Sequence, residues 1–169
     1  MKKKRENEII DVLKIIYRKL KQENIKWVIG GSTSLFLHRI DLKDVADIDI
    51  MTTKNDAFKI MKLFKDFEIK PIKFSKIDKI KSYWGQLKIK NIKIDIMGDF
   101  CERIGNRWIN ISRKRLKSPE YIKVGKFRFP VTSLQQHLES YKILNREKDT
   151  EKIKKIEEVL NKRRLQLKI

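Results

Sequence analysis

The sequence predicts one mixed α/β (α+β) domain in which a mixed, mostly antiparallel β-sheet is flanked by helices. Apolar residues recur at helical spacing near both ends of the chain and once in its first half. Between these segments lie short apolar runs that alternate with lysine and are bounded by Gly, Pro or Asn, as is typical of strands and turns. With 169 residues and no internal repeat or linker, the chain fits a single domain with its own core.

The first expected elements are a helix, a short strand and a second helix. Residues 6–23 carry apolar side chains at the spacing of an amphipathic helix. The run KWVIGG, residues 26–31, is typical of a short buried strand that ends at two glycines, and STSLFLHRI, residues 32–40, predicts a helix with Ser or Thr in its first turn. A strand, Gly-Gly and a helix N-terminus in this order form an anion-binding corner, because small residues let backbone N–H groups approach a ligand.

A second strand and helix follow. VADIDIM, residues 45–51, predicts the strand, and the run from residue 52 to residue 67 predicts the helix. Thr53 and Asp56 stand at the spacing of a capping box before this helix. Its expected apolar face consists of Phe58, Ile60, Met61, Leu63 and Phe64.

The next segments favour strands. Residues 68–74, EIKPIKF, predict an edge strand, where a proline is tolerated. Residues 85–98 predict a hairpin, with Asn91 in the turn and Gly98 at its end. Asp99 is then expected to be a turn residue rather than a further ligand.

The C-terminal third combines strands and helices. Strands are expected at residues 107–111 and across residues 121–131, where Gly125 marks a turn. Ser133 and Gln136 form a capping box that opens a helix through residue 144. A last helix is expected after Asp149.

These elements predict a single domain over residues 1–169. Within it we expect an N-terminal helix in residues 1–25, a catalytic sheet with its helices in residues 26–130, and a C-terminal helical segment in residues 131–169. His38 is expected to end a helix and His137 to lie on a helix surface, and neither has the partners of a zinc site.

Composition limits the class of protein. No apolar run approaches the roughly 18 residues of a membrane helix, and the basic start MKKKRE has no apolar signal core, so we expect a cytoplasmic protein without a membrane partner. The net charge is +20, but the lysines are spread along the chain and alternate with isoleucine. Two interpretations stay open: a solvated lysine-rich surface, or a face that binds RNA or another polyanion.

Two carboxylates stand one residue apart in the second strand. Asp47 and Asp49 share one face because strand side chains alternate, while Ile48 and Ile50 point to the other. Asp is a poor strand former, and a buried charge is costly without a partner, so the pair faces either water or a cation. Residues two apart in a strand lie roughly 6.5 to 7 Å apart at Cα, so both carboxylates can reach one ion or a pair of ions about 4 Å apart.

A third carboxylate belongs to the returning strand of the predicted hairpin. Ile92, Ile94 and Ile96 share one face of that strand, and Asp95 stands on the other. If this strand pairs beside residues 46–50 with both isoleucine rows in the core, Asp95 joins the other two aspartates. Three clustered carboxylates repel one another, and Mg²⁺ or Mn²⁺ would relieve that repulsion.

These motifs carry a resemblance. GGS at residues 30–32, DID at residues 47–49 and Asp95 on a later apolar strand resemble the DNA polymerase β-like nucleotidyltransferase superfamily. GGSTSLFLH and YKILNREKD are similar to the minimal nucleotidyltransferases, which include aminoglycoside adenylyltransferases and toxin or antitoxin nucleotidyltransferases. The resemblance spans about residues 26–150 and implies the nucleotidyltransferase fold.

The resemblance implies roles for individual residues. Asp47 and Asp49 would ligate two Mg²⁺ (or Mn²⁺) ions, and Asp95 would bind the second ion and accept the acceptor's proton. The phosphates of the NTP would contact Gly30, Gly31, Ser32, Arg146 and Lys148. Arg146, Lys148 and Asp149 are equally compatible with a helix break followed by a capping residue.

The expected function is therefore metal-dependent transfer of an NMP group from an NTP to a hydroxyl of an acceptor, with release of pyrophosphate. The acceptor class stays open between a small molecule, a protein side chain and RNA. Two alternatives remain: a catalytically idle nucleotide-binding or antitoxin-like partner protein, and a basic RNA-binding module in which the carboxylates are incidental.

Overall fold

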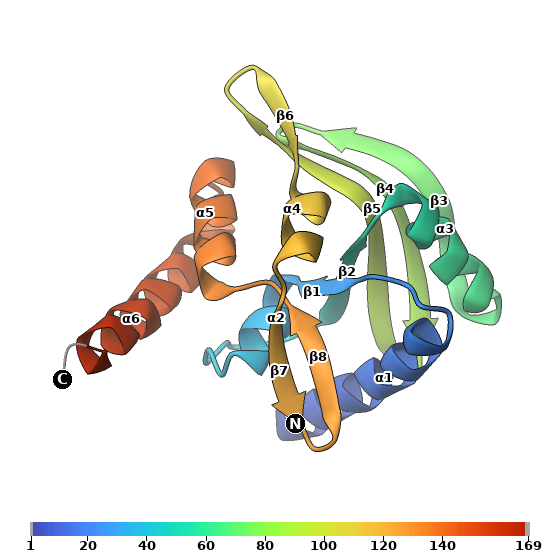
Figure 1. The fold of residues 1–169 in the computed structure, drawn as a ribbon, viewed down its shortest axis with the longest axis horizontal. Coiled ribbons are helices and arrows are strands. Elements are labelled where there is room, and N and C mark those ends of the chain that lie inside the picture. Colours follow the sequence, from blue (N-terminus) through green and yellow to red (C-terminus); the bar gives the residue numbers. More distant parts are fainter. Residues whose placement is uncertain (1, 168–169) are drawn as a thin grey trace.

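A strongly curved sheet of eight strands organises residues 2–167, which are the residues that the structure, a computed structural model, describes (Figure 1). The helices are α1 (Lys2–Gln22), α2 (Gly31–Leu37), α3 (Lys54–Leu63), α4 (Ile111–Lys117), α5 (Leu134–Leu144) and α6 (Thr150–Gln166). Two 3₁₀ turns, η1 (Lys65–Phe67) and η2 (Glu147–Asp149), lie between them. The strands are β1 (Val28–Gly30), β2 (Asp47–Thr52), β3 (Glu68–Ile77), β4 (Ile80–Ile89), β5 (Ile92–Ile104), β6 (Arg107–Asn110), β7 (Glu120–Val124) and β8 (Phe127–Val131).

The sheet is mixed and mostly antiparallel, as the sequence predicts. Its order is β3-β4-β5-β2-β1-β8-β7, and β6 pairs with the far end of β5. The pairs β2 with β5 and β1 with β8 are parallel, and the other pairs are antiparallel. β3 lies at one edge, so its Pro71 removes no hydrogen bond that a central strand would need.

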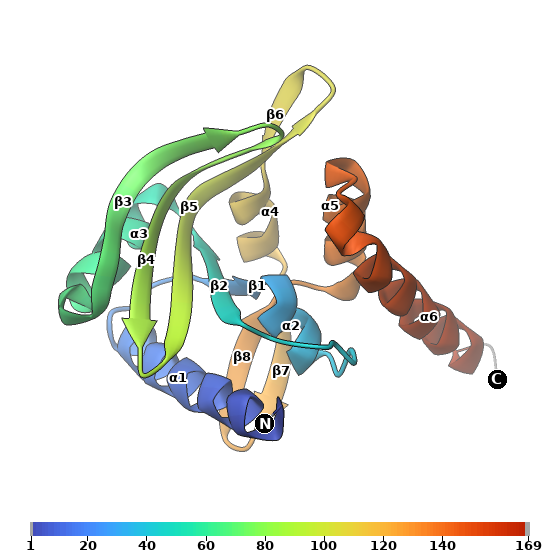
Figure 2. The same ribbon diagram turned by 180° about the vertical axis from the view of Figure 1, so that it is seen from behind.

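The two faces of the central strands differ in chemistry. The isoleucine row of β2 and β5 faces the main core, to which α1 and α3 contribute their buried side chains. Figure 2 shows α1 running across the ends of β4 and β5, and α3 beside β3. A smaller apolar cluster of Val28, Met51, Phe100 and Ile111 lies on the opposite face, under α4. The main core and this small cluster thus hold the central strands from both sides, and Asp47 and Asp49 share the face of the small cluster.

Several elements differ from their sequence-based prediction. The predicted hairpin end at Gly98 is wrong, because β5 continues through Gly98 to Ile104. Asp99 is not in a turn: it has φ +48° at an irregularity in the β4–β5 register, a bulge inside the strand. β4 also begins earlier, at Ile80.

Helical details also differ. The helix α4 was not predicted, and Phe58, expected on the apolar face of α3, is 48% exposed while Ala57 is buried. Thr53 caps α3 and the Ser133–Gln136 capping box of α5 is present, as predicted. His38 does follow the last residue of α2, but His137 is buried, so its prediction as a surface residue is wrong.

No helix of residues 2–167 is both long enough and apolar enough to cross a membrane.

Gly98 is needed for close contact between α3 and the sheet. A Cβ at this position would lie 2.8 Å from the Cβ of Ala57 and 3.0 Å from the Cα of Lys54. We therefore expect Gly98→Ala to lower the free energy of unfolding by about 1–3 kcal/mol, because α3 must move away from the strand. Chemical denaturation measures this loss. Combining it with Ala57→Gly should recover part of the loss in a double-mutant cycle, and additive losses would contradict the proposed contact.

Candidate active site

Three aspartates lie together at the centre of the sheet. In the parallel pairing of β2 with β5, Asp49 is directly opposite Asp95, and Asp47 precedes Asp49 on the same face. Neighbouring strands are about 4.8 Å apart, so this register brings the carboxylates close to one another. All three line one cleft of about 380 Å³. The prediction that Asp95 joins the other two aspartates is confirmed.

The corner between β1 and α2 faces these carboxylates. Gly30 pairs with Asp49 in the antiparallel β1–β2 ladder, and both Gly31 and Ser32 line the cleft. Gly31 has φ +56°, and a Cβ there would lie 1.7 Å from Oδ2 of Asp49, so only glycine fits beside this carboxylate. Thr33 donates a hydrogen bond of 2.6 Å from its hydroxyl to the Asp47 carbonyl and ties α2 to the start of β2. No side chain caps α2, contrary to a capping role for its Ser or Thr.

Burial and the neighbouring carboxylates raise the pKa values of Asp49 and Asp95. Burial, followed by the charges of Asp47 and Asp95, raises the pKa of Asp49 to about 7. Burial also raises the pKa of Asp95, and this is opposed by a 2.7 Å hydrogen bond that Gln86 Nε2 donates to its Oδ1. Gln86 on β4 therefore holds Asp95 in one orientation, a role that the sequence alone did not suggest.

The donor set fits a hard divalent cation by its chemistry. Three carboxylates offer the oxygen ligands that Mg²⁺ and Mn²⁺ prefer. As the side chains stand, no three carboxylate, imidazole or thiol groups among residues 2–167 converge on one point. Asp49 instead packs against Gly31. A cation shared by all three carboxylates therefore requires side-chain rotation, while the strand register already supplies the backbone spacing.

Cationic side chains from the C-terminal segment also line the cleft. Arg146, Lys148 and Lys152 line it, and the first two were predicted as site residues. Asp149 is fully buried beneath them: its Oδ2 accepts from Arg146 Nε at 2.6 Å, and its Oδ1 lies 3.5 Å from Lys152 Nζ. Asp149 stands at the N-cap position of α6, after the break between α5 and α6, as one of the two interpretations predicts, but its side chain makes no capping hydrogen bond to α6.

Sequence reasoning missed a buried cation behind the aspartates. Arg115 of α4 is 3% exposed, and its Nη2 donates to Ser140 Oγ at 2.7 Å. Buried Glu102 lies in the same part of the cleft; burial raises its pKa, and the positive charge of Arg115 opposes that shift. The bulge at Asp99 changes the alternation of β5, so that Glu102 faces the same cleft as Asp95.

The sequence matches the aminoglycoside-2''-adenylyltransferase family over residues 12–156. The chain belongs to this family. The match covers most of the chain and includes every site residue that the sequence predicts.

Solved structures agree with this family assignment. A crystal structure of a candidate nucleotidyltransferase from Thermotoga maritima is 33% identical, with a TM-score of 0.76 over 92% of this chain and 94% of that chain. The crystal structure of ANT(2'')-Ia in complex with adenylyl-2''-tobramycin has a TM-score of 0.60 at 8% identity, over 95% of this chain and 94% of that chain, and so shares the fold. No curated protein sequence matches this chain significantly.

This family member is thus an enzyme of the minimal nucleotidyltransferase type, as the sequence motifs predict. The family and its structural relatives establish nucleotidyl transfer as the class of reaction.

Proposed function

We propose that this protein transfers an NMP group from an NTP to a hydroxyl of an acceptor, in a reaction that depends on Mg²⁺ or Mn²⁺ bound to Asp47, Asp49 and Asp95. The observation that carries the proposal is the strand register that sets Asp49 opposite Asp95 in a cleft shared with Gly31 and Ser32. The raised pKa of Asp49 supports it, because a site that holds protons against repulsion gains most from a cation.

The chain supplies contacts for both ends of the reaction. The acceptor hydroxyl loses its proton to Asp95 as its oxygen attacks the α-phosphorus, and the bond from that phosphorus to the β-phosphate oxygen breaks. Gln86 keeps Asp95 oriented for this proton transfer. When bound, two divalent cations would neutralise charge on the attacking and leaving oxygens.

Two groups of hydrogen-bond donors would bind the negatively charged pyrophosphate as it leaves. Gly31 and Ser32, whose backbone N–H groups would contact the phosphates, line the cleft together with Arg146, Lys148 and Lys152. Cations and free N–H groups bind phosphate oxygens in both ground and transition states. These two groups of donors would hold the triphosphate with its α-phosphorus beside the carboxylates.

Incubation of the enzyme with each α-labelled NTP and Mg²⁺ tests the reaction. Three acceptor classes are supplied in parallel: hydroxylated small molecules including aminoglycosides, protein, and RNA. Label should pass to one class and be lost when EDTA is present. Label transfer that is unaffected by EDTA would overturn the metal dependence, and transfer to none of the three classes would favour the idle nucleotide-binding alternative.

Asp149 is proposed as a positioning residue for the triphosphate. Its buried carboxylate holds Arg146 and Lys152, which precede and follow η2 in the sequence and both line the cleft. Asp149→Asn should weaken NTP binding by about tenfold and lower stability by about 1–3 kcal/mol, because two cations lose their partner. Titration calorimetry and denaturation measure the two effects. Glu157→Gln, which breaks the exposed 2.6 Å pair with Lys142, is the matched control and should change neither by much. Unchanged NTP binding in Asp149→Asn would remove this role.

A further inference from the structure

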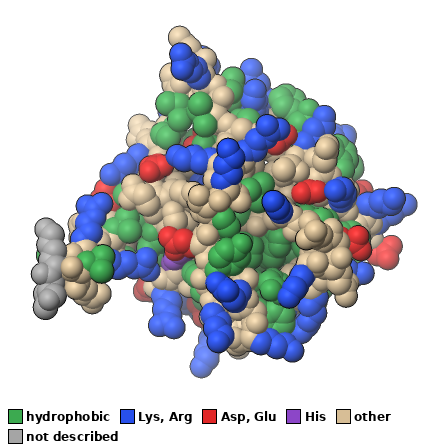
Figure 3. All heavy atoms as spheres, in the orientation of Figure 1, with side chains coloured by type: hydrophobic (Ala, Val, Ile, Leu, Met, Phe, Trp, Pro, Cys, Tyr) green, Lys and Arg blue, Asp and Glu red, His purple; other side chains and the backbone are tan. Residues whose placement is uncertain are grey.

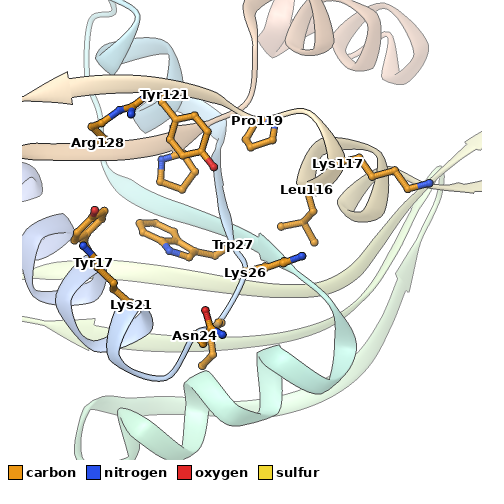
Figure 4. Close-up of a pocket in the computed structure, with 12 residues that line it drawn as sticks. Tyr17, Lys21, Asn24, Lys26, Trp27, Leu116, Lys117, Pro119, Tyr121 and Arg128 are labelled. Carbon is orange, nitrogen blue, oxygen red and sulfur yellow. The ribbon is translucent and has the colours of Figure 1, made fainter.

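A second hollow lies beside α4 (Figure 4), and it shares no lining residue with the catalytic cleft. Arg115 of α4 lines the catalytic cleft, whereas the next two residues, Leu116 and Lys117, line this hollow of about 570 Å³. Figure 4 shows Trp27 in its middle, with Tyr121 and Arg128 from the β7–β8 hairpin on one side and Tyr17 from α1 on another.

This hollow continues into a neighbouring one of about 590 Å³ beside the C-terminal half of α1. The two share Tyr17 and Lys21 as lining residues, and the second adds Arg18, Lys126 and Phe127. We call the two together the basic groove. Its charged side chains are Arg18, Lys21, Lys26, Lys117, Lys126 and Arg128, and its aromatic side chains are Tyr17, Trp27, Tyr121 and Phe127.

The charge of the basic groove is uncompensated. No carboxylate lines either hollow, and none of its six cations forms an ion pair with an acidic side chain of residues 2–167. The catalytic cleft differs, because there carboxylates and cations are mixed. Figure 3 shows hydrophobic side chains gathered near the middle of this face, with Lys and Arg side chains around them. A surface that is rich in lysine everywhere does not explain why acidic residues are missing from this groove in particular.

The aromatic side chains add a second kind of contact. Tyr121 is 56% exposed, and the guanidinium of Arg128 lies 5.3 Å from the centre of its ring. The guanidinium of Arg18 lies 5.1 Å from the ring centre of Phe127, but this ring is buried, so Tyr121 is the aromatic side chain with an accessible face. Aromatic rings and arginine planes offer flat faces on which bases stack, and nearby lysines bind the phosphates between those bases.

We propose that the basic groove binds single-stranded nucleic acid, separately from the catalytic cleft. Cations alone would suit any polyanion, but the exposed ring of Tyr121 beside Arg128 favours a ligand with unpaired bases. A duplex keeps its base faces stacked inside and leaves only phosphates for this surface. The proposal goes beyond nucleotidyl transfer, since none of the residues in the groove lines the catalytic cleft.

Fluorescence anisotropy with labelled 12-residue oligonucleotides tests the proposal without NTP or Mg²⁺. Single-stranded RNA and DNA of one sequence, the corresponding duplexes, and heparin as competitor separate the sources of binding. Binding of the single strands should weaken steeply with salt. Equal affinity for RNA and DNA identifies backbone and base stacking as the recognised chemistry, and a preference for RNA identifies the 2′-hydroxyl as a further contact.

Two sets of variants locate the binding. Tyr121→Ala should weaken single-strand binding about tenfold and leave heparin binding unchanged, whereas Tyr121→Phe should retain single-strand binding because it keeps the ring. The double reversal Lys21→Glu with Arg128→Glu should weaken all polyanions by at least about tenfold. Its matched control is Lys154→Glu with Lys162→Glu on α6, which makes the same change in net charge at exposed positions.

The results that overturn the proposal are definite. One is an equal loss of affinity in the control variant Lys154→Glu with Lys162→Glu and in Lys21→Glu with Arg128→Glu. The others are an unchanged single-strand affinity in Tyr121→Ala, and duplex binding as tight as single-strand binding. Each of these would assign the binding to the general positive charge of the surface. Melting temperatures of the variants show whether they are folded, and the exposure of Tyr121 predicts that its substitutions are tolerated.

Discussion

Replacing Asp49 with Asn should abolish nucleotidyl transfer while making the ligand-free protein more stable at neutral pH. The charge that the reaction uses is the same charge that the apo fold must tolerate beside Asp47 and Asp95. We expect activity to fall by at least about 10²- to 10³-fold, since one group of an electrostatic site is lost. We expect stability to rise by about 1–2 kcal/mol at pH 8, less than the roughly 4 kcal/mol of the full pKa shift, because the cleft admits water and counterions.

The sign of the pH dependence follows from the direction of the shift. Because the pKa of Asp49 is raised to about 7 in the folded state, the native protein holds this proton more tightly than the unfolded chain does. The stability gap between Asp49→Asn and wild type should therefore be absent near pH 4, open as the pH rises to about 7 and stay constant above that. Melting temperatures across this range measure it. Asp66→Asn, at an exposed position on η1, should have the stability of the wild type at every pH. A stability difference between Asp49→Asn and wild type that shrinks as the pH rises would contradict the clustering of the three carboxylates.

Gly31→Ala should be nearly as damaging to nucleotide binding. Its Cβ would lie 1.7 Å from Oδ2 and 2.8 Å from Cγ of Asp49, at a φ of +56° that alanine adopts at a cost of about 1 kcal/mol. Asp49 must move, and the backbone corner that would hold the phosphates must change. We expect NTP affinity to fall by about 10²-fold, measured by titration calorimetry.

Gly30→Ala is the matched comparison for this change. At Gly30 a Cβ would first meet the flexible Met51 side chain, at 3.2 Å, and its φ of −110° is ordinary for alanine. Its loss of NTP affinity should therefore be clearly smaller than that of Gly31→Ala. Equal losses would show that the close approach of Asp49 to Gly31 has no special importance.

The strand register was predictable because two isoleucine rows must share one core. Burying Ile48 with Ile50, and Ile94 with Ile96, leaves only one face for the aspartates, so the alternation determined the cluster before the pairing was known. The parallel direction of β2 and β5 had no such signal. The bulge at Asp99 had none either, and it decides which side chains of the later part of β5 face the cleft.

The missed parts of the site depend on tertiary burial. The seven residues of α4 are rich in lysine and arginine, so nothing in the sequence marked Arg115 as the one that is buried. Asp149 is a good capping residue by type, yet its side chain binds Arg146 and Lys152 instead. His137 is different: its spacing from Leu134, Leu138 and Tyr141 places it on the buried stripe of α5, and the periodicity could have shown this.

A thermal-shift titration with ATP, GTP, CTP and UTP, each with and without Mg²⁺, tests whether the three aspartates form a cation-dependent nucleotide site. A ligand at about one hundred times its dissociation constant adds roughly 2.7 kcal/mol to stability, which is readily measured. We expect a Mg²⁺-dependent rise in melting temperature with at least one nucleotide for the wild type and none for Asp49→Asn. No rise with any nucleotide, or an equal rise in Asp49→Asn, would contradict a cation-dependent nucleotide site at the three aspartates.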